Sequence, residues 1–137
     1  MNRRELLIGA AAVAVAATAK AAPKDKPAEP VNALMDATVD CQKKAELCLT
    51  HCLAMFASGD TSMARCAAAV RETLATSRAL ETLAAANSKH LKELAKVCAE
   101  ICKDCEAECR KHQATMTVCR DCADACAKMI QEVGRLA

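Results

Sequence analysis

Aromatic residues are almost absent from this chain of 137 residues, which has one Phe, Phe56, and no Trp or Tyr. Its net charge is only +2. Nucleic-acid-binding proteins carry basic patches and often stack bases on aromatic rings, so both features argue against a nucleic-acid partner. A core without large rings must also be built from small side chains, and these bury less apolar area. We therefore expect a fold that depends on helix propensity and helix length.

Proline and glycine are also scarce, with three residues of each. No Pro follows Pro30, and only Gly59 and Gly134 follow Ser58, so long helices are permitted almost everywhere. The breaks that remain lie at 57–60, 87–88 and 112–117. They divide the chain into four expected helices, near 32–57, 61–86, 89–112 and 116–135. Short connections favour antiparallel neighbours, which predicts an all-α, up-down-up-down four-helix bundle.

The breaks contain residues that commonly begin and end helices. Gly59 suits a helix C-terminus, and Asp60 or Thr61 is expected to cap the second helix. Thr115 or Thr117 is expected to cap the fourth.

The N-terminus resembles an export signal of the twin-arginine type. Arg3 and Arg4 precede an apolar run over 6–19 that is too short to span a bilayer, and Ala19 and Ala21 frame a cleavage site. We expect a signal peptide over 1–22, a Pro-rich linker over 23–30 and the bundle over 31–137. The mature protein is then expected in the periplasm, nearly neutral and not inserted in the membrane. An uncleaved N-terminal anchor is the alternative.

Eleven cysteines are the most informative feature of the chain. Cys98, Cys102, Cys105 and Cys109 fall within a stripe of roughly 60° on one helix face. Two further runs have helical spacing, and the second expected helix has a single cysteine. These remaining positions are Cys41, Cys48 and Cys52, then Cys66, then Cys119, Cys122 and Cys126.

The antiparallel arrangement gathers most of the sulfur at one end of the bundle. This mouth end is predicted to include Met55, Met63 and Met116, with His112 interacting with the dipole at the end of the third helix. The opposite, closed end is predicted to be an apolar plug of Leu34, Leu80, Leu91, Leu94, Ile130 and Val133.

Several thiol chemistries compete for this pattern. A disulfide scaffold fits poorly, because the number of cysteines is odd and thiols one turn apart on a helix are badly placed to pair, although pairing between helices remains open. Iron–sulfur motifs need loops with other spacings, and no C-x-x-C-H haem motif occurs. Structural zinc sites take four ligands, usually from turns, and do not form continuous stripes.

Cu(I) fits the spacing best. It is soft and accepts two or three thiolates or thioethers, so each C-x3-C pair offers two sulfurs one helical turn apart. If every thiolate bridges two ions, the chain holds roughly ten ions. One Cu(I) per thiolate also cancels the buried charge, so uptake is expected to release protons from a neutral core.

The helical C-x3-C pairs and the stretch from Lys96 to Cys105 resemble the four-helix-bundle copper storage proteins, and the leader resembles their exported branch. The resemblance implies Cu(I) held inside the bundle, entry at a mouth lined by His51, Met55 and Met63, and association as a homotetramer. The chain departs from the family pattern in its second helix, where Thr73 and Ser77 face inward.

We therefore predict a protein that is not an enzyme and that stores or buffers several Cu(I) ions on its eleven cysteines, with His51, Met55 and Met63 as further ligands. Copper-delivering and copper-receiving proteins are the expected partners. The alternatives are a copper chaperone or detoxification protein and, less favoured, a disulfide-stabilised or thiol-redox protein.

Overall fold

Four helices account for most of the described chain. The computed structural model describes residue 14 and residues 26–136. The expected signal peptide and the linker up to residue 25 lie outside the described residues, apart from Ala14. The helices are α1 (Glu29–Ala57), α2 (Ala64–Ala85), α3 (Leu91–Arg110) and α4 (Thr117–Gly134). Among the described helices, none is sufficiently long and apolar to cross a bilayer.

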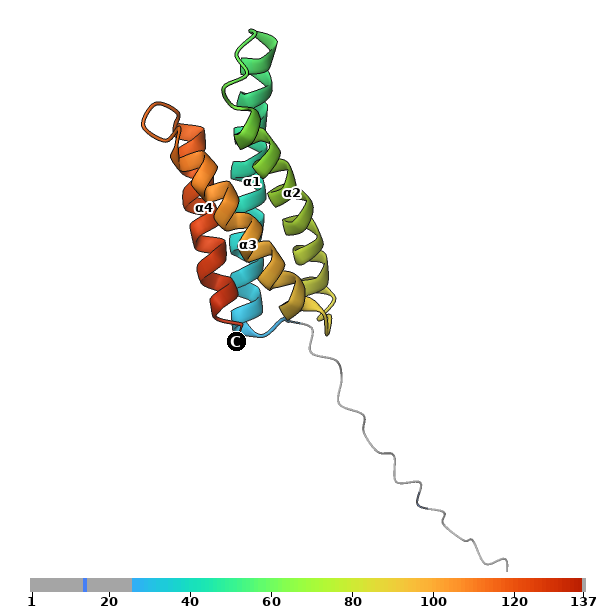
Figure 1. The fold of residues 1–137 in the computed structure, drawn as a ribbon. Coiled ribbons are helices and arrows are strands. Elements are labelled where there is room, and N and C mark those ends of the chain that lie inside the picture. Colours follow the sequence, from blue (N-terminus) through green and yellow to red (C-terminus); the bar gives the residue numbers. More distant parts are fainter. Residues whose placement is uncertain (1–13, 15–25, 137) are drawn as a thin grey trace, which may run out of the picture.

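The helices pack as an antiparallel square. α1 packs against α2 and α4, and α3 packs against the same two helices. The backbones of the diagonal pairs of described helices are farther apart, and only side chains in the core bridge them. Figure 1 shows the start of α1, the α2–α3 connection and the C-terminus together at the closed end. At the mouth end, the α1–α2 hairpin extends past the α3–α4 connection (Figure 1). The all-α, up-down-up-down bundle predicted from the sequence is confirmed.

The helix boundaries differ from the predicted ones by up to three residues. α1 begins at Glu29 rather than 32, so two residues expected in the linker form its first turn. Pro30 fits there because a first-turn residue needs no N–H donor. α3 ends at Arg110, which leaves His112 beyond the helix, where its N–H donates to the Cys109 carbonyl.

The capping predictions were partly wrong. α2 begins after Met63 and α4 after Met116, and neither helix has a hydrogen bond from a capping side chain. Asp60 instead accepts the Ser62 N–H at 2.9 Å in the turn before α2. Gly59 follows the last residues of α1 with φ of +87°, as expected for the residue after a helix C-terminus.

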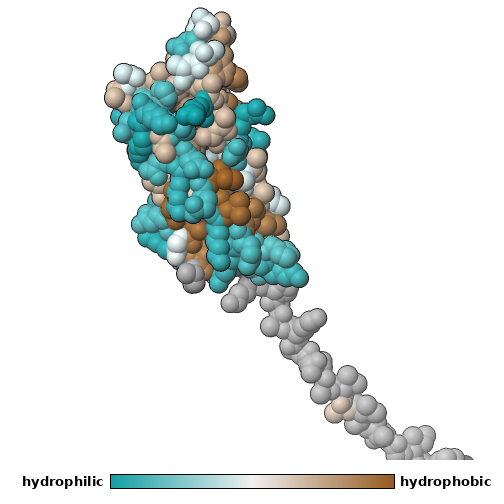
Figure 2. Space-filling view, viewed as in Figure 1, coloured by the Kyte–Doolittle hydropathy of each residue, from teal (hydrophilic) through white to brown (hydrophobic). Residues whose placement is uncertain are grey.

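The apolar faces of the helices meet inside the bundle, and charged side chains cover the outside. Figure 2 shows a mainly hydrophilic face with an apolar patch toward the end that holds the C-terminus. At the closed end, Leu34, Leu80 and Leu91 are buried as predicted, while Leu94, Ile130 and Val133 are only half-buried. The remaining interior is dominated by cysteine and alanine.

Candidate metal centre

All eleven cysteines lie inside the bundle. Each has no solvent-exposed area, and each is a free thiol. The helical stripe predicted for α3 exists, because all four of its cysteines are buried on one face. α1 and α4 supply three cysteines each, and α2 supplies Cys66 alone. We call these eleven thiols the thiol network.

Sulfur atoms from different helices are in direct contact. Cys66 Sγ lies 3.7 Å from Cys48 Sγ on α1 and 3.6 Å from Cys109 Sγ on α3. Cys41 Sγ lies 3.9 Å from Cys126 Sγ on α4. Cys41 and Cys66, which have no cysteine partner within one turn of their own helices, therefore find sulfur across the bundle.

These contacts build several overlapping groups of three thiols. Within each group the Sγ atoms all lie within 4.8 Å of one another. The groups are Cys41/Cys102/Cys126, Cys48/Cys66/Cys119, Cys48/Cys109/Cys122 and Cys105/Cys122/Cys126. Because Cys48, Cys122 and Cys126 each belong to two groups, the arrangement suits bridging thiolates rather than isolated four-ligand sites.

The thiols differ in how readily they lose a proton. Burial, followed by the negative charge of Cys48, raises the pKa of Cys52 to about 11 and that of Cys119 to about 12. Deeper in the bundle, hydrogen bonds, first from Cys102, lower the pKa of Cys41 to about 5. A thiolate is therefore stabilised where neighbouring thiols donate to it, while Cys52 and Cys119 stay protonated at neutral pH.

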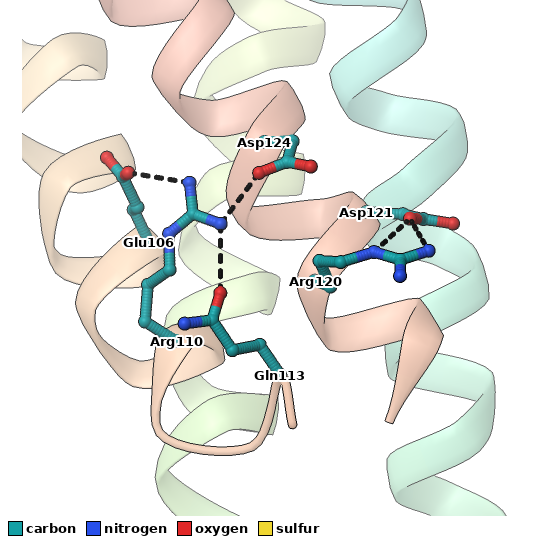
Figure 3. A network of polar contacts seen from close by, with 6 residues as sticks. All are labelled: Glu106, Arg110, Gln113, Arg120, Asp121 and Asp124. Carbon is teal, nitrogen blue, oxygen red and sulfur yellow. Dashed lines mark hydrogen bonds and ion pairs between the residues drawn. The ribbon is translucent and has the colours of Figure 1, made fainter. Parts of the chain in front are cut away.

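A network of ion pairs supports the mouth end from outside. Figure 3 shows the Arg110 guanidinium joining Glu106, Asp124 and Gln113. Arg110 donates to Asp124 on α4 at 2.6 Å and to Glu106 on α3 at 3.0 Å, and these carboxylates raise the pKa of Arg110. The ion pairs of Arg110 join the end of α3, next to Cys109, to the first half of α4.

The sequence profile of copper storage proteins matches residues 27–137. The chain belongs to the copper storage protein family. An uncharacterized cysteine-rich protein of Bacillus subtilis strain 168, YhjQ, is 32% identical over 111 residues, which is 71% of this chain and 93% of that relative. Residues 1–26 lie outside the family match.

Two solved structures of copper storage proteins share the fold. The apo form of copper storage protein 3 from Bacillus subtilis superposes with a TM-score of 0.68 at 28% identity, covering 77% of this chain and 97% of that one. The Cu(I)-bound form of the copper storage protein BsCsp3 gives a TM-score of 0.69 at 27% identity, covering 80% and 99%.

In this copper storage protein, the non-cysteine residues predicted as ligands occupy different environments. Met63 is fully buried before α2, and Met55 is half-buried near the end of α1. His51 is half-buried, and its Nε2 atom is shielded from solvent without a hydrogen-bond partner. Their role as ligands stays a prediction.

The structure places two further residues, Met129 and Thr73, in the interior beside the thiol network. Met129, not considered as a ligand from the sequence, is fully buried on α4 with Sδ 3.7 Å from Cys102 Sγ. Thr73 on α2 is also fully buried, and its hydroxyl lacks a hydrogen-bond partner. The sequence did contain a signal for Met129: it follows Cys122 and Cys126 at a spacing of i, i+4, i+7, which places the three residues on neighbouring parts of one helix face.

Proposed function

We propose that this protein stores Cu(I) by binding many ions to the thiolates of its thiol network. The observation that carries the proposal is the continuity of that network: nine of the eleven buried thiols, from four helices, form overlapping groups whose Sγ atoms lie within 4.8 Å of one another. Membership of the copper storage protein family and the Cu(I)-bound state of a related structure support it.

Thiolate sharing gives the expected capacity. Cu(I) takes two or three soft ligands, so sulfurs that each bridge two ions hold roughly one ion per cysteine. Eleven buried thiolates without a metal would be strongly unfavourable, and one Cu(I) per thiolate removes the net charge. Loading therefore exchanges protons for copper inside a water-excluding core.

The ligand set of the proposal comprises the eleven cysteines of the thiol network and, at the mouth end, His51, Met55 and Met63. The unpartnered Nε2 of His51 and the burial of Met63 beside the sulfur-rich end of the bundle support these three. Ions enter at the mouth and move inward by exchange between neighbouring thiolates. The proposed role is binding rather than catalysis, because every thiol is buried and none is offered to an external substrate.

Anaerobic titration of the reduced protein with Cu(I) tests the proposal. Binding is followed by competition with a Cu(I) chelator and is expected to saturate near roughly ten ions per chain. Saturation at one or two ions would contradict storage and favour a chaperone. Thiol counting under denaturing, non-reducing conditions is the control, because a value near eleven excludes a disulfide scaffold.

The proposed cellular setting is the periplasm, reached through the twin-arginine route, with copper-delivering and copper-receiving proteins as partners. The paired Arg3 and Arg4 before a short apolar run support this location. Replacing Arg3 and Arg4 with Lys is expected to keep the protein in the cytoplasm. An unchanged amount of protein in the periplasmic fraction would contradict the twin-arginine route. A homotetramer is the proposed assembly, and a monomeric mass in sedimentation equilibrium would refute it.

A further inference from the structure

A buried methionine on α4, Met129, lies against the thiol network. Met129 has no exposed area, and its Sδ lies 3.7 Å from Cys102 Sγ. Cys102 belongs to the group formed with Cys41 and Cys126, which is contributed by three different helices. The thioether is therefore in contact with one member of a group of three thiols.

Apart from the thiols themselves, the buried side chains near this end offer no further free ligand to a soft ion. Leu34 and Leu80 are fully buried, and the Thr38 hydroxyl is committed to the Leu34 carbonyl at 2.7 Å. Glu132, one turn beyond Met129, is buried, but its carboxylate pairs with Lys128 at 2.6 Å and with Arg135 at 3.1 Å. Met129 therefore carries a soft donor atom here in addition to the free thiols, among which Cys98 lies one turn beyond Cys102 on α3.

A thioether is a suitable ligand in this buried environment. It is soft, as Cu(I) requires, and it is neutral, so it can bind an ion without adding a negative charge to a core without solvent.

We propose that the Met129 thioether is a ligand of a Cu(I) ion bound at the Cys41/Cys102/Cys126 group of the thiol network. This inference rests on the proposed storage of Cu(I). It assigns Met129 a ligand role in addition to packing, and it makes Cys102 the thiolate that shares this ion with it.

The test uses the reduced full-length protein with selenomethionine in place of methionine, loaded anaerobically with Cu(I). X-ray absorption at the selenium edge is expected to show scattering from copper at bonding distance. The scattering amplitude should fall in Met129→Leu and persist in Met35→Leu, where a half-buried methionine outside the thiol network is removed. Leu conserves volume, so both variants should fold.

Two measurements on the same variants, prepared with methionine in place of selenomethionine, separate the possible outcomes. In 13C-methyl-methionine spectra, the Met129 signal, assigned from the variant, is expected to shift during loading. Under a competing chelator, Met129→Leu should retain about one ion fewer than wild type. An unshifted Met129 methyl signal at full loading, or copper scattering unchanged in Met129→Leu, would overturn the ligand role. Saturation of wild type at one or two ions would instead overturn storage itself.

Discussion

Thr73 offers a direct test of how the thiol network is built, because it places a hydroxyl where the other helices place sulfur. The side chain is fully buried, and its Oγ1 has no partner with hydrogen-bond geometry. It lies close enough to Cys105 to help lower the pKa of that thiol, after the larger effect of hydrogen bonds from neighbouring thiols, Cys109 first. A buried, unsatisfied hydroxyl costs about 1–3 kcal/mol. Thr73→Cys replaces it with a weaker hydrogen-bonding group that tolerates burial and adds a twelfth thiol.

Two effects are expected from Thr73→Cys. The free energy of unfolding of the reduced, copper-free protein should rise by about 1 kcal/mol, which corresponds to a Tm increase of about 4 °C. Copper capacity under a competing chelator should rise by about one ion, because the new thiolate can bridge to Cys105.

The assays are thermal unfolding followed by circular dichroism and anaerobic Cu(I) titration. Protein concentration has to come from amino-acid analysis, because the chain contains no Trp or Tyr. Thr82→Cys is the matched control: Thr82 is exposed on the same helix, and its hydroxyl already donates to the Arg78 carbonyl at 3.1 Å. A loss of stability in Thr73→Cys, or a capacity equal to that of wild type, would refute the reasoning.

Three further results are expected. Replacing Met55 and Met63 together with Leu should slow Cu(I) loading in stopped-flow measurements and leave capacity nearly unchanged; a large fall in capacity would make them principal ligands. Arg110→Ala should lower the free energy of unfolding by about 0.2–1 kcal/mol, and added salt should shrink the difference, since partly exposed ion pairs contribute little. Cu(I) affinity should fall as pH falls through the neutral range. The pKa values of Cys52 and Cys119 are raised, so the first ions that bind at the mouth must displace protons from these thiols. Competition with a Cu(I) chelator at several pH values, corrected for the protonation of the chelator, measures this dependence. An affinity that does not change with pH would contradict the prediction.

The sequence predicted the bundle well because its signals were simple. Helical spacing of the cysteines fixed the inward face of each helix, and rare Gly and Pro residues marked the breaks. The start of α1 was placed too late because Pro30 is compatible with both a linker and a first helical turn. The N-caps were misplaced because packing of the bundle, rather than capping side chains, determines where α2 and α4 begin.

Periodicity could not decide the closed end of the site. Met129 and Ile130 both lie about 50° from the centre of the cysteine stripe on α4, on opposite sides. The sequence predicts Ile130 as part of the apolar plug at the closed end, but the structure buries Met129 completely and leaves Ile130 half-buried. Only the position of α4 against α3, which brings Met129 to Cys102, separates the two.

The complete burial of the thiols also bears on oxidation. Neighbouring thiols can be oxidised to disulfides, and each disulfide would remove two thiolate ligands for Cu(I). Oxidants react with exposed thiolates, however, and every cysteine thiol here is shielded by the four helices. The same enclosure that excludes water from bound copper therefore protects the empty protein, so that its binding capacity can survive an oxidising environment until copper arrives.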